Sequence, residues 1–302
     1  KNKFLSTQLR YAGQINKQNT NIAGLAMQFH HRFFFLTTLA LFLLPILTSA
    51  DYGDTIMSAQ TREQVLANVT VTITEPETSS GVTFLLPGSL VQESEYNSYR
   101  NELVGLGQTV ISFYINVLWP PLNNHRAQAK KVKALFDTYC EEQEDHSKNC
   151  PSKYNIVGHS VGGKIALIVL AHTDPERVET VIALDPIDQN PSEFTGGGHL
   201  SLDGATEGTT ILTLTNGGLG ISKMHDAGSI HMNFPDTTTL VRHEDAGHFA
   251  YTDNGGGASG ALMPDRGTKE GNAFAYEDAH RLIHKYIGGV NMIQEDEYSE
   301  QL

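Results

Sequence analysis

The sequence predicts an α/β fold in which helices cover both faces of a mostly parallel central sheet. Short β-rich runs alternate with helical segments over residues 68–287. Such alternation is typical of chains in which each crossover helix returns to begin the next parallel strand. A second observation is Ser160, which lies between two glycines where an apolar strand meets the next helix. Both features favour the same fold class.

The first half of this alternation begins with a strand whose residues alternate with period two. The segment "NVTVTIT" occupies residues 68–74, and two β-rich runs follow at 81–88 and 108–116. Residues 94–107 have helical spacing and end in a glycine, and residues 123–143 form an amphipathic helical pattern. These signals predict two helices and three strands.

The second half contains four further strands, two helices and the serine. The predicted elements are, in order, strand 154–160, helix 161–171, strands 178–186, 209–217 and 237–244, and helix 272–287. Gly288-Gly289 ends the last helix. We therefore expect a single α/β domain over residues 51–290, followed by an acidic tail at 291–302.

The charge of the chain excludes one class of partner. It has 21 Lys and Arg against 34 Asp and Glu, a formal net charge of −13. Nucleic acid binding needs clustered cations that neutralise phosphates, so no nucleic acid partner is expected.

The N-terminal region has the pattern of a signal peptide. From Met27, an arginine precedes the apolar run 33–47, and Thr48-Ser49-Ala50 ends it with small residues. The run is shorter than a bilayer span, so residues 27–50 are expected to be cleaved. Residues 1–26 are upstream sequence or a longer leader.

Entry into the secretory pathway gives meaning to two other features. Asn68-Val69-Thr70 is an acceptor sequence for N-glycosylation. Cys140 and Cys150 lie ten residues apart and are either one disulfide or two free thiols.

Gly158-His159-Ser160-Val161-Gly162 matches the pattern of a nucleophile elbow. In such a turn the serine takes a positive φ, and side chains at the two glycine positions would collide with neighbouring backbone. The turn presents the serine hydroxyl at the carboxyl edge of the sheet, with the amide of Val161 beside it.

A serine hydroxyl needs a histidine to take its proton and an acid to orient that histidine. His248 follows the last predicted strand and a small-residue turn, which makes it the expected base. A zinc site is not expected, because His243 and His248 are five residues apart and not at the i, i+4 spacing of H-E-x-x-H.

The acid follows an earlier strand than is usual in this fold. The second strand after the elbow ends in Asn-Gly without a carboxylate, whereas Asp185 ends the first. Asp185 is the expected acid because a triad requires hydrogen-bond geometry and not a particular strand. The alternatives are Asp188, Asp226 and Asp245.

The remaining candidates concern the substrate. The loop after strand 81–88 would present the amide of Ser89 opposite that of Val161, completing an oxyanion hole. Leu90, His159 and Trp119 are placed among the residues that contact substrate. His159 is expected to pack or hydrogen-bond within the elbow, and Trp119 is either part of a packed corner or of an apolar mouth.

The segments "GHSVGGK", "VIALDPID", "TNGGLG" and "DAGHFAYTD" together resemble the chlorophyllase family of α/β-hydrolases. The resemblance covers roughly residues 82–286, although Val161 stands where the plant pattern has arginine. It implies an α/β-hydrolase fold and hydrolysis of the phytyl ester of chlorophyll, without a cofactor. It also implies Ser160 as nucleophile, Asp185 as acid and His248 as base.

Two rival functions share these residues. One is a secreted lipase, cutinase or polyester hydrolase, and the other is a non-catalytic binding protein on a hydrolase fold. The expected partner is a small apolar ester, with room for transient contact with a membrane surface. An algal-type member could end in the extracellular space, the endomembranes or a plastid of secondary origin.

Overall fold

The computed structural model of the protein describes part of the chain. The described residues are 59–89, 91–115, 125–142, 150–187, 202, 209–215, 227–257, 260 and 267–289. They belong to one compact unit, Thr55–Leu302. The expected leader, the residues before it and the acidic tail lie outside the described residues.

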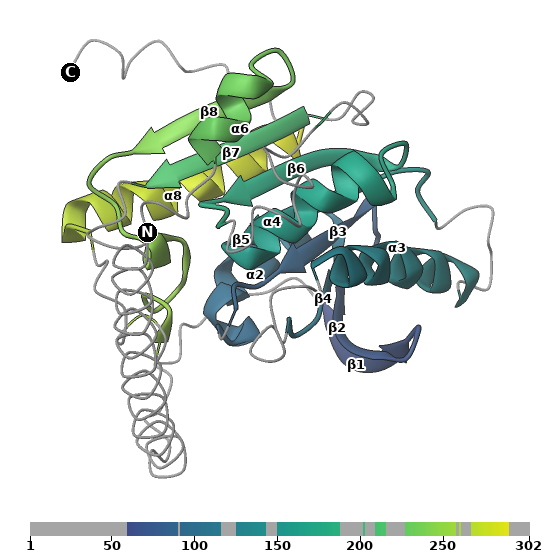
Figure 1. The fold of residues 1–302 in the computed structure, drawn as a ribbon. Coiled ribbons are helices and arrows are strands. Elements are labelled where there is room, and N and C mark those ends of the chain that lie inside the picture. The colour runs from purple at the N-terminus through teal and green to yellow at the C-terminus, as the bar shows by residue number, and fades with distance from the viewer. Residues whose placement is uncertain are drawn as a thin grey trace, which may run out of the picture. The chain divides into compact units, whose positions relative to one another are not determined.

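An eight-stranded, mostly parallel sheet forms the centre of the domain (Figure 1). The strands are β1 Gln60–Leu66, β2 Val69–Glu75, β3 Gly81–Leu86, β4 Gln108–Ser112, β5 Tyr154–His159, β6 Val178–Leu184, β7 Thr209–Thr215 and β8 Thr238–His243. Their spatial order is β1-β2-β4-β3-β5-β6-β7-β8. β1 and β2 pair antiparallel, as do β2 and β4, and the other neighbours are parallel. This is the sheet of an α/β-hydrolase fold, as predicted.

Helices pack on both faces of this sheet. The helical elements are η1 Glu93–Tyr96, α2 Asn97–Gly105, α3 His125–Glu142, α4 Val161–Ile168, η2 Val169–Thr173, α6 Ala227–Asn233, η3 His248–Tyr251 and α8 Lys269–Tyr286. One hydrophobic cluster gathers buried residues of α3, α4 and α6, and the other gathers those of α2 and α8. The two clusters lie on opposite faces because side chains alternate along each strand.

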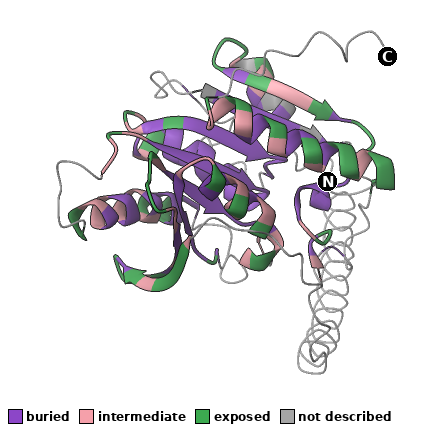
Figure 2. Ribbon diagram, turned by 180° about the vertical axis from the view of Figure 1, so that it is seen from behind, coloured by how far each residue is buried: buried purple, intermediate pink, exposed green. Residues whose placement is uncertain are grey.

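β6 shows this alternation directly. Val181 and Ala183 belong to the cluster beneath α3 and α4, whereas Ile182 and Leu184 belong to the cluster beneath α2 and α8. Figure 2 shows the central strands buried, with exposed residues on the outer faces of the helices. A strand buried on both sides reads as a continuous apolar run, which is why "TVIALD" predicted one.

Three elements are absent from the sequence prediction: β1, α6 and the single turn η3. β1 exposes most of its side chains and fully buries only Leu66, so no apolar alternation marks it. α6 is a short helix of 7 residues, too short for a periodic pattern. The last helix begins at Lys269, three residues before the predicted start, because the Thr268 side chain caps it by accepting from the amide of Gly271.

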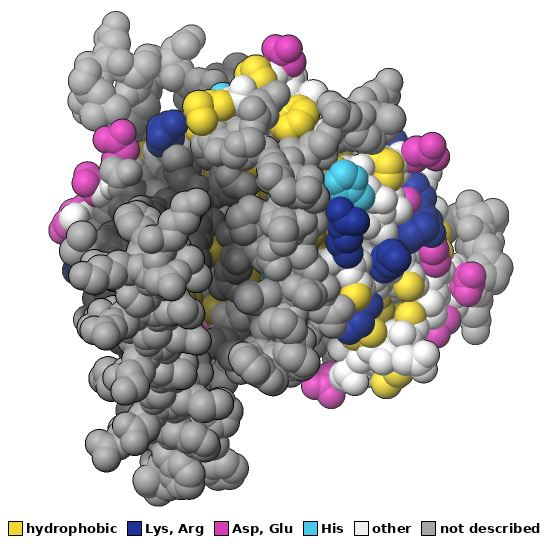
Figure 3. Space-filling model, in the orientation of Figure 1, with side chains coloured by type: hydrophobic (Ala, Val, Ile, Leu, Met, Phe, Trp, Pro, Cys, Tyr) yellow, Lys and Arg dark blue, Asp and Glu magenta, His cyan; other side chains and the backbone are white. Residues whose placement is uncertain are grey.

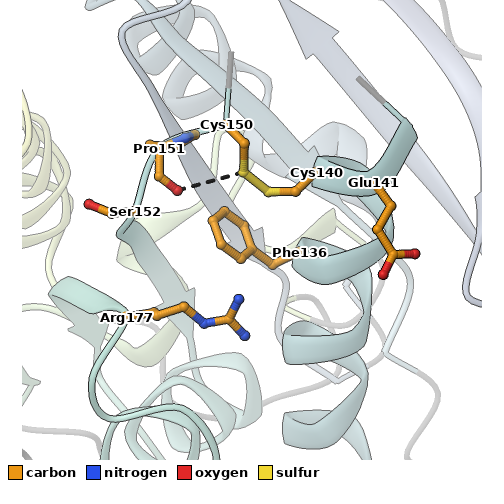
Figure 4. Close-up of a pocket in the computed structure, with 7 residues that line it drawn as sticks. All are labelled: Phe136, Cys140, Glu141, Cys150, Pro151, Ser152 and Arg177. Atoms are coloured by element: carbon orange, nitrogen blue, oxygen red, sulfur yellow. Dashed lines mark hydrogen bonds between the residues drawn. A yellow bond between two sulfur atoms is a disulfide. The ribbon is translucent and has the colours of Figure 1, made fainter. Parts of the chain in front are cut away.

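The two cysteines form a disulfide at the end of α3. Cys140 and Cys150 are bridged, with their Cα atoms 5.3 Å apart. Figure 4 shows the bridge beside Phe136 and Arg177 in a surface pocket of about 340 Å³. Arg177 directly precedes β6, so the pocket lies at the amino edge of the parallel strands, opposite to the edge that carries the elbow.

Several basic side chains lie close together on the face of the molecule that carries α3. Figure 3 shows Lys and Arg side chains together near α3, whose sequence contains Arg126, Lys130, Lys131 and Lys133.

In the described residues, no helix is both long and apolar enough to cross a membrane.

Candidate active site

The elbow has the strained backbone that the sequence predicted. Ser160 has φ 58° and ψ −122° and lies between β5 and α4. A Cβ added at Gly158 would lie 2.5 Å from the carbonyl oxygen of Gly162, and one added at Gly162 would collide with the Leu86 carbonyl. Only glycine fits at either position, so the turn depends on both. It leaves Ser160 at the carboxyl edge of the sheet, 6% exposed.

The loop after β3 lies directly against this serine. A Cβ added at Gly88 would approach the Ser160 Cβ to 3.2 Å, so the backbone of the loop passes at closest packing distance. Ser89 follows Gly88 and is partly buried, and Val161 begins α4. The geometry therefore places the loop of one predicted oxyanion amide beside the helix N-terminus that carries the other.

Asp185 is held rigidly at the end of β6. Its carboxylate accepts from the amide of Thr215 at 3.1 Å and from the Thr215 hydroxyl at 2.8 Å. Its own amide donates to the hydroxyl of Thr213 at 2.8 Å. Asp185 is fully buried and has φ 43°, a conformation that these contacts from β7 maintain.

His248 completes a buried carboxylate–imidazole pair. Its Nδ1 lies 2.6 Å from Asp185 Oδ2, and the side chain is 3% exposed. The pairing fixes the ring with Nδ1 as donor and leaves Nε2 as the nitrogen that can accept a proton. Upstream, the amide of Gly247 donates to the Asn272 side chain on α8 at 2.8 Å, which anchors the turn before the histidine.

Two hydrogen bonds hold the ring of His159 within the elbow. Its Nδ1 lies 2.7 Å from the Tyr96 hydroxyl and its Nε2 lies 2.8 Å from the backbone oxygen of His248. The residue is 1% exposed. This arrangement is that of a residue packed and hydrogen-bonded within the elbow.

A second histidine–carboxylate pair, His243 and Asp278, joins β8 to α8. His243, at the end of β8, contacts the Tyr251 hydroxyl through Nδ1 at 2.7 Å and Asp278 through Nε2 at 3.0 Å. Burial alone would raise the pKa of Asp278, but the hydrogen bonds from His243 and Arg281 lower it below its ordinary value. The pair joins β8 to α8 and so supports the segment that carries His248.

Other predicted residues fall outside the described part of the chain. These are the proposed substrate contacts Leu90 and Trp119 and the alternative acids Asp188 and Asp226. The last alternative, Asp245, is exposed, and its contact with Thr268 is made by its backbone oxygen. Among the residues that the structure describes, no group of three or more His, Cys, Asp and Glu could hold a metal ion.

Sequence reasoning missed the residues that orient the acid. Thr213 and Thr215 lie two apart on β7, so their side chains project from the same face toward Asp185. The alternating threonines of "TTILTLT" were the available signal, but they read equally well as ordinary β-formers.

The chain matches no family model and no curated protein. Solved structures share its fold. A dienelactone hydrolase-like promiscuous phosphotriesterase from metagenomic libraries has a TM-score of 0.56 and 13% identity over 76% of this chain and 98% of its own. A putative dienelactone hydrolase from Klebsiella pneumoniae has a TM-score of 0.53 and 10% identity over 77% of this chain and 100% of its own. A predicted CIB-like hydrolase from Thermoplasma acidophilum has a TM-score of 0.50 and 13% identity over 78% of this chain and 100% of its own. The likeness at these identities is one of fold.

Proposed function

We propose that this protein is a serine carboxylic-ester hydrolase in which Ser160, His248 and Asp185 form the catalytic triad. The observation that carries the proposal is the 2.6 Å contact between His248 Nδ1 and Asp185 Oδ2, at the sheet edge where the strained elbow presents Ser160. A buried carboxylate that orients a histidine, together with a serine held at a positive φ by a nucleophile elbow, supplies the three groups that acyl transfer requires.

The proposed reaction proceeds in two halves. Ser160 Oγ attacks the ester carbonyl while its proton passes to His248 Nε2, and the amides of Ser89 and Val161 receive the developing oxyanion. The C–O bond of the leaving alcohol breaks as His248 returns that proton to the alcohol, which leaves an acyl-serine. Water then attacks this ester with His248 as base, releasing the acid and restoring Ser160. Asp185 stays ionised and stabilises the imidazolium throughout.

For the substrate, we propose an apolar ester of the chlorophyll type. Support comes from the sequence resemblance and from the position of the acid, which ends β6 and is held by threonines of β7. Trp119 remains the sequence candidate for the apolar mouth. The rival secreted lipase or cutinase would use the same triad and differ only in the substrate it accepts.

A panel of substrates tests both parts of the proposal. Wild-type protein is expected to hydrolyse a short p-nitrophenyl ester, and Ser160→Ala is expected to reduce turnover by about 10⁶-fold because it removes the attacking atom. A Ser160→Ala protein within tenfold of wild type would contradict the triad. Chlorophyll a and a long-chain triglyceride, offered to the same preparation, separate a chlorophyllase-like enzyme from a lipase. A well-folded wild type inert on every ester would favour the binding protein.

We also propose that the protein is exported. The predicted leader and the Cys140–Cys150 disulfide support this, since structural disulfides persist in oxidising compartments.

A further inference from the structure

A continuous run of hydrogen bonds joins three loops around Ser160. The amide of Gly88 donates to the Tyr96 hydroxyl at 3.0 Å. That hydroxyl lies 2.7 Å from His159 Nδ1, and His159 Nε2 lies 2.8 Å from the backbone oxygen of His248. Tyr96 and His159 are each 1% exposed.

The chemistry of the two ends, together with a neutral His159 ring, fixes the direction of every bond between them. A backbone amide can only donate and a carbonyl oxygen can only accept. The Tyr96 hydroxyl therefore accepts from Gly88 and donates its own proton to His159 Nδ1. His159 then carries its single proton on Nε2 and donates it to the carbonyl of His248. Burial raises the pKa of Tyr96, which keeps the phenol protonated for this role.

Three groups with proposed catalytic roles lie along this run of hydrogen bonds. Gly88 precedes Ser89, His159 precedes Ser160, and the accepting carbonyl belongs to His248 itself. We propose that Tyr96 and His159 are positioning residues that hold the oxyanion amide, the nucleophile and the base in one fixed arrangement. The inference rests on the proposed function, because only a serine hydrolase needs these three groups in register.

The ring of His159 is closely packed against both the loop that carries Gly88 and the ring of His248. A Cβ added at Gly88 would lie 3.1 Å from His159 Nδ1, and the rings of His159 and His248 have centroids 4.7 Å apart. A small change in the ring of His159 is therefore transmitted to both loops. Since a shift of about 1 Å at a catalytic group can cost 100-fold in rate, loss of the hydrogen bonds should appear in turnover.

The decisive variant removes one oxygen atom. Tyr96→Phe keeps the ring but deletes the acceptor of the Gly88 amide and the donor to His159. We expect kcat on a short p-nitrophenyl ester to fall by about 10- to 100-fold, with KM within about threefold. Tyr99→Phe is the matched control: Tyr99 is also fully buried, and its hydroxyl has no hydrogen-bond partner among the described residues. It should retain wild-type kcat.

A pair of substitutions at His159 separates positioning from packing. His159→Gln keeps an amide that can donate toward the His248 carbonyl, whereas His159→Leu keeps only bulk. Partial recovery of kcat in His159→Gln relative to His159→Leu is expected. Equal kcat in the two variants, or a Tyr96→Phe enzyme as fast as Tyr99→Phe, overturns the proposal.

Nitrogen NMR of ¹⁵N-histidine-labelled protein reports the tautomer of His159 directly, so it tests the proposed hydrogen bonds without an activity assay. His159, assigned by its loss in His159→Gln, should be the Nε2–H tautomer in wild type. An Nδ1–H tautomer would overturn the bridge even if the protein is an esterase. If wild type shows the Nε2–H tautomer but hydrolyses no ester, the proposed function fails while the hydrogen-bonded bridge stands.

A separate observation concerns the hairpin between β1 and β2. Leu66 pairs with Val69, so Ala67 and Asn68 form a two-residue turn, and both have positive φ, 46° and 63°. Asn68 is exposed at the tip, and so is Thr70. Asn68-Val69-Thr70 is the one N-x-S/T sequence of the chain whose middle residue is not proline.

We propose that Asn68 carries an N-linked glycan when the protein is exported. The hairpin tip can accept a bulky oligosaccharide without disturbing the core, because the Asn68 side chain is exposed. β1 is the last strand at its end of the described sheet, and Val65 on it is 64% exposed. A glycan beside this edge would hinder pairing with another chain.

Mobility on a gel tests the glycan. The full chain, expressed with its own leader in a eukaryotic cell, should shift after N-glycosidase treatment. Thr70→Ser should keep the shift, and Thr70→Ala should lose it without altering the Asn68 turn. A wild-type chain that does not shift, or a shift that persists in Thr70→Ala, overturns the proposal.

Discussion

Replacing Asp185 with asparagine removes the charge of the proposed acid while keeping its shape. The Thr215 amide can only donate, so the carbonyl oxygen of the new side chain must occupy the Oδ1 position, 3.1 Å from that amide. The NH₂ group then occupies the Oδ2 position, 2.6 Å from His248 Nδ1. It donates to Nδ1 and forces the imidazole proton onto Nε2, where His248 can no longer accept the proton of Ser160. The opposite orientation would set two donors against each other at Thr215.

The expected loss of kcat is about 10³- to 10⁴-fold, equivalent to roughly 4 to 5.5 kcal/mol of transition-state stabilisation. Stability should change little, because the contact with the Thr215 amide survives and the Thr215 hydroxyl can turn to accept from the new NH₂ group. The assay is steady-state hydrolysis of a short p-nitrophenyl ester, with thermal unfolding of the same samples as a check on folding.

Asp245→Asn supplies the matched control for this experiment. It makes the same chemical change three residues before His248, on a side chain that is exposed. It should retain nearly full activity, as should Asp188→Asn and Asp226→Asn. Activity of Asp185→Asn within tenfold of wild type, or a large loss in any of the other three variants, would show that the acid is assigned wrongly.

Three further outcomes follow from the fold. Gly162→Ala should destabilise the protein by about 3 kcal/mol or more in denaturant titration, because the new methyl group collides with the Leu86 carbonyl; an unchanged midpoint would argue against the close approach of this loop to the elbow. Unreduced protein should show no thiol from Cys140 or Cys150, and reduction should lower the free energy of unfolding by about 2 to 3 kcal/mol, as expected for a short loop; two titratable thiols before reduction would contradict this. Burial, together with the charge of a nearby lysine, lowers the pKa of His125 from 6.5 to about 4. As the pH falls below 6.5, His125 becomes protonated in the unfolded chain before it does in the folded one. The free energy of unfolding is therefore unaffected by His125 above pH 6.5 and falls by up to ~3 kcal/mol as the pH drops toward 4. His125→Gln should flatten the pH dependence of stability in that interval.

The elbow could be predicted because its requirements are local. The two glycines that allow the turn are two residues from Ser160 on either side, so five consecutive residues contain the whole steric requirement of the turn. The strands were visible for the same reason, because the burial of each strand appears as an apolar run in its own sequence. Asp185 could be proposed as the acid because the predicted strand 209–217 ends in Asn-Gly, without a carboxylate.

The helix and strand that sequence reasoning missed lack such local marks. β1 is held by its pairing with β2, and its exposed side chains carry little information about that pairing. Its existence follows from backbone hydrogen bonds, which almost any sequence can make.

By itself, the sequence determined the fold class and the backbone of the elbow, and it predicted a serine, an acid and a histidine in that chain order. Only the tertiary structure decided which groups hold them. Tyr96, His159 and the carbonyl of His248 are separated by 63 and 89 residues. Their contact depends on the register and twist of strands between them, and a shift of a single residue in register would remove it. Local steric rules are encoded by neighbours in the chain, whereas a directional hydrogen bond between distant residues exists only after the whole sheet has assembled.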